Sequence, residues 1–349
     1  MPALVSILIP AYNAERWIAN TIESAINQTW PKKEVIIIDD GSSDNTLQIA
    51  KQFESKSVKV KTQENSGASN ARNKALSFAQ GEYIQWLDAD DLLAPDKIEK
   101  QLEKGDITPD SMILLSSCYA NFYYRYHKAT FVPNSLWQDL TPVEWLLTKF
   151  TENIWMNPAV WLVTRRLTEL AGPWDDRLSL DDDGEYFCRV VAASVKVKFI
   201  PEARIYYRLA NARSLSRATS YKACESLLLS LSLSFRHLLS LESSQRTRDA
   251  CLEYLARWFH YFYPEKKQLV HKVHDLASSL GGTVPGPSLP LKYRLLSRLF
   301  GWQVAKEAMS WVSDSKLLLR SQYDWILSKF SKNASYPARL NSESKVSSL

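Results

Sequence analysis

Apolar and polar residues alternate in short blocks through the first hundred positions of the chain, and the blocks predict strands and helices in turn. Continuous β-branched apolar runs of about five residues are typical of strands buried on both faces. The expected strands are 5–9, 34–38, 58–62, 83–87 and 112–118. Helical periodicity follows at 14–28, 47–53, 68–79 and 96–104. This order predicts right-handed βαβ units and an α/β fold with a mixed, mostly parallel sheet flanked by helices.

The pattern changes further along the chain. Residues from about 121 onward are less regular and rich in aromatics, with two more strands expected at 195–200 and 203–207. Leucine, serine and helix formers dominate after residue 216, which indicates a helical region. We divide the chain into an α/β domain at 1–216, a helical region at 217–280, a linker at 281–290, basic amphipathic helices at 291–330 and a disordered tail at 331–349.

Composition excludes several classes of protein. The 349 residues are 45% hydrophobic and 23% charged, as in ordinary soluble globular proteins, and a net charge of +5 does not by itself indicate nucleic-acid binding. The four scattered cysteines lack metal-ligand spacing, so we expect buried reduced thiols. The first residues read as a strand rather than a signal peptide, and no apolar run is long enough to span a bilayer. We expect a cytoplasmic location, peripheral on the inner face of the membrane if 291–330 binds lipid.

The segment 291–330 carries the basic excess of the chain. Leu291, Leu295 and Leu299 alternate there with basic residues such as Lys292 and Arg298. We expect the apolar side of these helices to pack on the α/β domain and the basic side to face solvent. The alternative is docking on an anionic membrane surface.

Acidic residues follow the strand 83–87. Asp88, Asp90 and Asp91 place three carboxylates within four positions, where they repel one another unless a positive group sits among them. Ligands bind at such strand ends in open α/β sheets, and Mg²⁺ prefers one or two carboxylates together with phosphate oxygens. The alternative is an acidic turn that caps the next helix.

A second acidic pair ends the strand 34–38. Turn and cap chemistry explains Gly41 and Asp44, but it does not explain Asp39 and Asp40 side by side at a buried strand end. Two such strand ends in one sheet predict one shared acidic crevice.

Two further segments carry candidate chemistry. The small residues before Arg72, at 65–71, lead into a helix that could approach a phosphate, and Arg72 could reach an anion or pair with the acidic cluster. The run Asp181-Asp182-Asp183 reads either as a solvated loop before a helix or as the source of a general base. No glycine-rich turn follows the first strand and no Walker-type loop is present, which argues against dehydrogenases and kinases.

Taken together, these segments resemble a known family. The runs 6–13, 39–46, 65–73 and 81–91, followed by 161–163, 172–175, Asp182-Asp183 and 206–208, are similar in order and spacing to the family 2 inverting glycosyltransferases of the GT-A fold. The resemblance covers about residues 3–216, and makes that part the expected catalytic domain.

The resemblance implies a role for each matching residue. Asp40 would receive the base of a nucleotide diphosphate sugar, Asp88 would lie toward the ribose, and Asp90 would hold Mg²⁺ or Mn²⁺. Asp183 falls at the position of the catalytic base, with Asp182 as its acidic neighbour. The family usually has Glu-Asp at this point, whereas this chain has Asp-Asp, so either aspartate could be the base. The remaining residues that would line the nucleotide pocket are Pro10, Ala11, Tyr12, Glu15 and Arg72.

The implied reaction moves a sugar from the donor to an acceptor hydroxyl, on a saccharide, lipid-linked or protein acceptor, in surface polysaccharide or glycoconjugate synthesis. The rival is a catalytically silent nucleotide-sugar-binding module on the same fold, with a nucleotidyltransferase as a weaker one. Trp155, Trp161 and Trp174 are expected in the core, and the latter two are the better candidates for the acceptor side.

Overall fold

The computed structural model describes residues 2–209, 219–287 and 290–330. The predicted tail at 331–349 lies outside the described residues, as do residues 288–289 of the predicted linker.

The main sheet confirms the α/β prediction. It has five strands in the order β3-β2-β1-β4-β8, of which the first four run parallel and β8 antiparallel to β4. The strands are β1 (Val5–Ala11), β2 (Lys33–Asp39), β3 (Val58–Thr62), β4 (Tyr83–Trp86) and β8 (Val163–Thr164). The buried β-branched runs of β1 and β2 form the centre of the core, so the carboxyl ends of β1, β2 and β4 meet at one edge.

A second sheet packs above the first, in the order β5-β9-β6-β7. Its strands are β5 (Leu92–Leu93), β9 (Lys196–Arg208), β6 (Ile113–Phe122) and β7 (Thr130–Phe131). The prediction of two strands at 195–200 and 203–207 is wrong, because β9 is continuous. Its register against β6 jumps from Ile200 to Arg204 between Ser117 and Cys118, so an irregularity takes up the extra residues without ending the strand.

Short helices flank the sheets. They are α1 (Ile18–Ile26), α2 (Thr46–Lys51), α3 (Ala68–Phe78), α4 (Lys97–Gly105), α6 (Arg165–Ala171) and α7 (Asp182–Ala193), with 3₁₀ turns at Tyr126–Lys128 and Pro158–Val160. Helix α1 begins later than its apolar pattern predicts. Asn13 has a left-handed backbone, φ +48°, and Trp17, with φ −124°, departs from helical geometry directly before α1.

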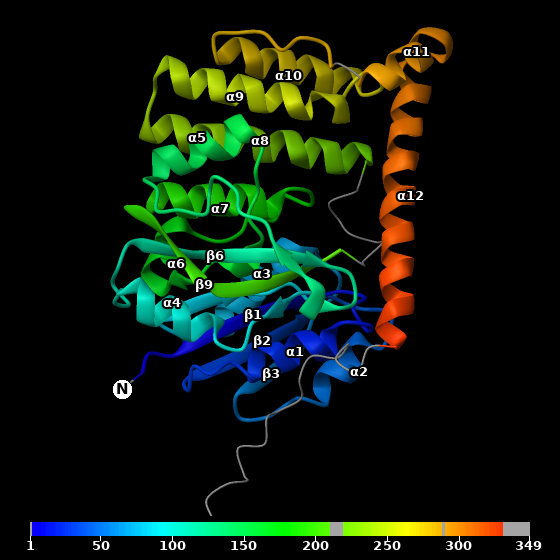
Figure 1. Ribbon diagram of the computed structural model, residues 1–349. Coiled ribbons are helices and arrows are strands. Elements are labelled where there is room, and N and C mark those ends of the chain that lie inside the picture. The colour runs from blue at the N-terminus through cyan, green and yellow to red at the C-terminus, as the bar shows by residue number, and fades with distance from the viewer. Residues whose placement is uncertain (1, 210–218, 288–289, 331–349) are drawn as a thin grey trace, which may run out of the picture.

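A layer of helices covers the upper side of the second sheet (Figure 1). It contains α5 (Pro142–Glu152), α8 (Tyr221–Leu241), α9 (Gln245–Trp258) and α10 (Lys267–Ser279), with a 3₁₀ turn at Phe259–Tyr261. One continuous hydrophobic core runs from β1 into α10. All four cysteines are buried free thiols, as predicted.

Serines on the leucine-rich helix α8 fix the acidic loop before α7. Ser226 Oγ accepts the N–H groups of Ser179 and Leu180 at 2.7 and 3.0 Å. Ser230 Oγ donates to the carbonyl and to Oδ2 of Asp181, at 2.8 and 2.6 Å. The helical layer therefore positions the predicted site as well as covering the sheet.

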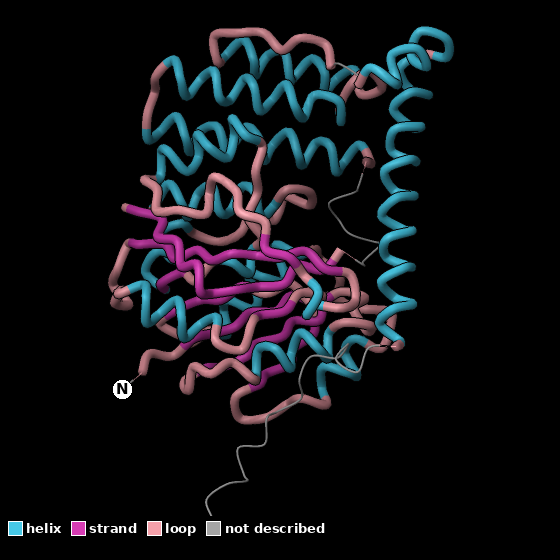
Figure 2. The backbone as a smooth tube through the Cα atoms, in the orientation of Figure 1, coloured by secondary structure: helices cyan, strands magenta, loops and turns pink. Residues whose placement is uncertain are grey.

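Two terminal helices stand along one side of the molecule, as Figures 1 and 2 show. These are α11 (Leu291–Phe300) and α12 (Trp302–Lys329). The prediction that the apolar side of these helices packs on the α/β domain is wrong for most of their apolar residues. Leu291 is 82% exposed and Trp311 71%, and Ala305 is the one buried residue of the described part of both helices. The far end of α12 is held by Asp324, which accepts hydrogen bonds from Tyr124 and Arg125. No helix among the described residues is both long and apolar enough to cross a membrane.

Candidate active site

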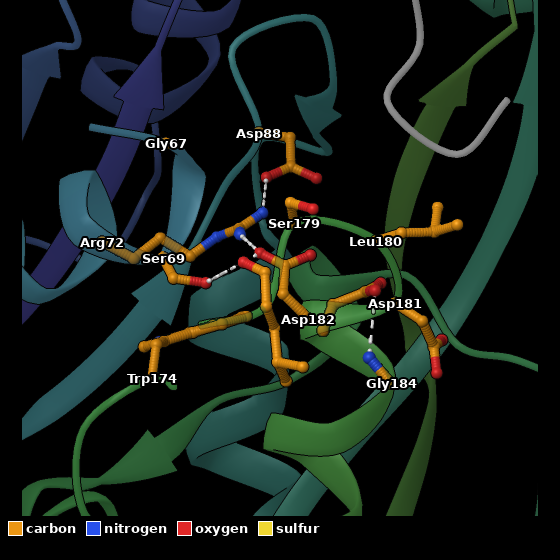
Figure 3. A network of polar contacts seen from close by, with 12 residues as sticks. Gly67, Ser69, Arg72, Asp88, Trp174, Ser179, Leu180, Asp181, Asp182 and Gly184 are labelled. Carbon is orange, nitrogen blue, oxygen red and sulfur yellow. Dashed lines mark hydrogen bonds and ion pairs between the residues drawn. The ribbon is translucent and has the colours of Figure 1, made fainter. Parts of the chain in front are cut away.

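Arg72 joins three segments that are far apart in the sequence (Figure 3). From α3, its Nη1 lies 2.6 Å from Oδ2 of Asp182 at the start of α7, and its Nη2 lies 2.9 Å from Oδ1 of Asp88 after β4. The guanidinium stacks on the ring of Trp174 at 4.3 Å. Burial alone would lower the pKa of Arg72, but Asp182 and Asp88 raise it above its ordinary value. The expected pairing of Arg72 with the acidic cluster is therefore present.

Asp40 fixes the loop that leads into α3. Its carboxylate accepts the N–H groups of Ser66 and Gly67, both at 2.9 Å, and the side-chain amide of Gln63 at 2.7 Å. Gly67 has a φ of +91°, which a residue with a side chain rarely adopts. Asp40 thus places the N-terminus of α3, and with it Arg72, beside the strand ends.

The other residues predicted for the nucleotide pocket lie at this same edge. Ala11 pairs with Asp39 in the sheet register, so Pro10, Ala11 and Tyr12 end β1 beside the end of β2. Tyr12 is 53% exposed there. Glu15 accepts two hydrogen bonds from Asn45, at 3.1 and 2.9 Å, and so joins the loops that follow β1 and β2.

Asp91 is a buried structural carboxylate. Its oxygens accept the backbone N–H of Arg208 at 2.8 Å and the side-chain amide of Asn157 at 2.7 Å. Burial raises the pKa of Asp91 well above its ordinary range, and Asp90 and Asp88 add to the rise. The Nε of Arg208 donates to the Asp90 carbonyl at 2.7 Å. Asn157 is a supporting residue that sequence reasoning missed, since nothing local marks it.

Asp181, Asp182 and Asp183 have three different environments at the start of α7. Asp182 is paired with Arg72, whereas Asp183 accepts only the N–H of Gly184 among the hydrogen bonds of the described residues, at 2.9 Å. Burial raises the pKa of Asp183 to about 7, with Asp182 and Asp181 as further causes. Asp181 has a left-handed backbone, φ +59°, and a Cβ on Gly184 would lie 2.1 Å from its Oδ1.

A cavity of about 360 Å³ opens beside these carboxylates. Its wall includes Asp181, Asp182 and Asp183, aromatic side chains from α5, α9 and β9, and Lys149. Tyr207 links this wall to the β4 end: burial raises its pKa, and the carboxylates that raise it further are Asp91, Asp90, Asp88 and Asp183. Arg72 and Tyr207 therefore connect the acidic residues after β4 with those at the start of α7.

The burial of the three tryptophans agrees with the prediction for two of them and not for the third. Trp161 and Trp174 are buried, as expected for core residues. Trp155 is 41% exposed and lies against Tyr207, with ring centroids 5.1 Å apart, so the prediction that it belongs to the core is wrong. Trp174 packs beneath Arg72 and supports the ion pairs rather than lining the cavity.

The residues present fit a divalent cation bound together with a phosphate ligand. Asp88 and Asp90 are half-buried at the β4 end, and Asp91 is already saturated by hydrogen bonds. In the described ranges, no three His, Cys, Asp or Glu side chains converge tightly enough to hold a metal by themselves. Mg²⁺ is usually held by one or two carboxylates and completes its shell with phosphates and water, so a sparse protein contribution suits it.

The mixed, mostly parallel sheet, with aspartates at the ends of β2 and β4, is a fold of the GT-A class. The S. aureus protein TarS, crystallised with UDP-GlcNAc, superposes with a TM-score of 0.61 at 19% identity, covering 80% of this chain and 81% of that one. A glycosyl transferase family 2 model matches residues 6–153. This segment of the chain is therefore similar to glycosyl transferase family 2.

Curated relatives match the same part of the chain. The glycosyltransferase TuaG of Bacillus subtilis (strain 168), named for teichuronic acid biosynthesis, is 48% identical over 103 residues, 29% of this chain and 41% of TuaG. The Escherichia coli UDP-Glc:alpha-D-GlcNAc-diphosphoundecaprenol beta-1,3-glucosyltransferase WfgD is 43% identical over 100 residues, 28% of this chain and 40% of WfgD. The chain thus spans less than half the length of either relative.

Proposed function

We propose that this protein transfers a sugar from a nucleotide diphosphate sugar to an acceptor hydroxyl with inversion of the anomeric carbon. The observation that carries the proposal is the Arg72 bridge between Asp88 and Asp182, which joins the acidic end of β4 to the cavity lined by Asp183, in a chain that matches family 2. The names of TarS in complex with UDP-GlcNAc and of WfgD as a UDP-Glc enzyme favour a uridine diphosphate sugar as donor.

Within this proposal, Asp183 is the general base. A base must hold an unprotonated carboxylate within reach of the acceptor hydroxyl. Asp182 is occupied by Arg72, whereas Asp183 faces the cavity with no ion pair among the described side chains. Its raised pKa, about 7, makes it a better proton acceptor than an ordinary aspartate.

The donor side uses the strand ends. Asp40, with Pro10, Ala11, Tyr12 and Glu15, forms the pocket for the nucleoside, and Asp88 lies toward the ribose. Asp90 would hold Mg²⁺ or Mn²⁺, which when bound neutralises the negative charge that develops on the leaving diphosphate. Arg72 keeps Asp88 and Asp182 in place and adds positive charge at the same edge.

We also propose that α11 and α12 contact an anionic membrane surface from the cytoplasmic side. Their exposed apolar residues include Leu295, Leu299 and Trp311. Beside these, the described part of 290–330 contains seven Lys or Arg and three Asp or Glu residues. An exposed apolar face with basic flanks is the pattern of helices that lie in the lipid headgroup region. A lipid-linked acceptor in surface polysaccharide synthesis would be presented there.

The transferase proposal is tested by incubating the full chain with a panel of uridine, guanosine and thymidine diphosphate sugars, with Mn²⁺, Mg²⁺ or a chelator. Release of nucleoside diphosphate, with the metal raising the rate, is the expected result. A silent binding module would be stabilised by the nucleotide in a thermal-shift measurement and would release none. That combination would refute the proposal and favour the rival.

A further inference from the structure

Lys149 on α5 is a buried cation without a hydrogen-bond partner among the described residues. It is 5% exposed, and no described carboxylate lies within ion-pair distance of its Nζ. The nearest aromatic partner is the ring of Tyr254, 5.7 Å from Nζ. An ammonium group carries three donors, and leaving them unpaired in the interior costs free energy. Because Lys149 lines a cavity, water or a bound ligand can supply the acceptors that these side chains do not.

The ammonium belongs to the same cavity as the proposed base. Lys149 lines the 360 Å³ space together with Asp181 and Asp183. The Oδ2 of Asp181 is already bound by Ser230 at 2.6 Å. Burial would lower the pKa of Lys149, but Tyr254 and the nearby acids outweigh it and raise the pKa, so the group stays charged. The cavity thus has carboxylates on one part of its wall and a fixed positive charge on another.

The remaining wall supplies flat apolar surface. Trp145, Trp155, Trp161 and Trp258 line it. Ligand pockets commonly combine aromatic walls with a few polar groups that fix orientation. A ligand complementary to this wall brings acceptor oxygens toward Lys149.

We propose that Lys149 binds an oxyanion, a carboxylate or a phosphate, carried by the acceptor saccharide whose reacting hydroxyl lies at Asp183. The inference rests on the proposed transferase function and assigns the class of acceptor that this site selects. Lysine binds such groups as a point charge, and charge-assisted hydrogen bonds to them are about twice as strong as neutral ones.

The alternative is that Lys149 only offsets the negative charge of Asp181 and Asp183. The two roles make different predictions. An internal counterion supports all ligands equally, because its loss disturbs the carboxylates whatever binds. A recognition group distinguishes anionic from neutral ligands of the same shape.

The test is a titration that requires no catalysis. Intrinsic tryptophan fluorescence of the full chain is followed with three probes: a neutral glucose disaccharide, the same disaccharide oxidised to a uronic acid, and the same disaccharide bearing a phosphate monoester. We expect at least one anionic probe to bind about tenfold more tightly than the neutral one, a factor within the range of one charge-assisted hydrogen bond. The anionic probe that binds more tightly shows whether the site prefers a carboxylate or a phosphate.

Three variants complete the test. Lys149→Met should remove the preference while leaving the affinity for the neutral probe unchanged, and Lys149→Arg should keep most of it. Lys104→Met, which removes an exposed lysine on α4, is the matched control and should behave as wild type. Equal binding of all probes by the wild type overturns the proposal, even if Lys149→Met does not fold. So does a Lys149→Met protein that keeps the preference or loses neutral and anionic binding together. Donor hydrolysis measured without acceptor on the same samples tests the transferase function separately.

Discussion

The guanidinium of Arg72 lies 2.6 Å from the carboxylate of Asp182, which is 110 residues further along the chain. The same side chain holds Asp88, so the loop after β4 and the start of α7 are clamped to α3. This clamp pairs Asp88 and Asp182 and leaves Asp183 without an ion pair among the described residues.

Replacing Arg72 should destabilise the protein and abolish activity. Arg72→Met leaves two carboxylates without their partner. We expect a loss of about 2–3 kcal/mol in the free energy of unfolding, less than the ~3–5 kcal/mol typical of fully buried pairs, because Asp88 is partly exposed. Chemical denaturation measures it. Arg236→Met removes an exposed arginine and should change neither stability nor turnover; an Arg72→Met protein as stable as this control would contradict the clamp.

Asp183→Asn should lower the transfer rate by about 10²–10⁴-fold, the usual contribution of a general base. The amide cannot accept the acceptor proton, while the shape of the side chain and the Gly184 contact are largely kept. Steady-state transfer assays with donor saturating measure the effect. Asp176→Asn, at an exposed carboxylate nearby, is the control. Turnover close to wild type in Asp183→Asn would remove this residue from the mechanism.

The activity should fall as the pH drops below about 7. Asp183 has its pKa raised to about 7 chiefly by burial, so acid protonates it and removes the base. A profile of kcat/KM against pH between 5 and 9 should show an acidic limb near that value. A flat profile down to pH 5 would mean that the group is not the base or that its pKa is ordinary.

The raised pKa of Asp183 also makes stability depend on pH, but here the loss comes at high pH rather than at low pH. A carboxyl whose pKa is higher in the folded state than in the unfolded one binds an extra proton on folding between the two values. This contribution to stability is present at low pH and is lost as the pH rises toward about 7. Thermal melts should therefore show Asp183→Asn gaining stability relative to wild type from pH 4 to pH 7; parallel melting curves would contradict this.

Gly184 cannot be replaced without moving Asp181. The Cβ of Gly184→Ala would lie 2.1 Å from Oδ1 of Asp181, whose carboxylate is fixed by Ser230. We expect a loss of about 1–3 kcal/mol in the free energy of unfolding, as for overpacked sites, together with a large loss of transfer. Gly286→Ala, where a Cβ meets nothing within 4 Å, should be silent in the same denaturation and activity assays. Equal stability of the two variants would show that the start of α7 adjusts freely.

Binding to anionic vesicles should depend on the exposed apolar residues of α11. The combined change Leu295→Ser, Leu299→Ser and Phe300→Ser removes side chains that are 64–66% exposed, so folding should be unaffected. Co-sedimentation with phosphatidylglycerol vesicles should fall several-fold, and phosphatidylcholine vesicles should bind weakly in all cases. Leu170→Ser, at a leucine that is 64% exposed on α6, should bind as wild type. Unchanged sedimentation of the triple variant would end the membrane proposal for this helix.

Sequence reasoning works best here where the signal is local. Apolar runs predict β1, β2 and β4 within a few residues, because a strand buried on both faces needs them. The alternation of valine and lysine predicts the edge strand β3. It fails where the backbone departs from regular geometry. The non-helical φ of Trp17 delays the start of α1, and β9 passes through an irregularity that a strand pattern reads as a break.

The order of residues alone determined the α/β architecture and delivered aspartates to the ends of β2 and β4, since apolar periodicity and turn chemistry are properties of neighbouring positions. Only the tertiary structure decided which acids are paired, because Arg72 reaches Asp88 and Asp182 from another part of the chain. It also decided that α11 and α12 expose their apolar side. An amphipathic pattern predicts an apolar face on a helix, but it does not predict what packs against that face.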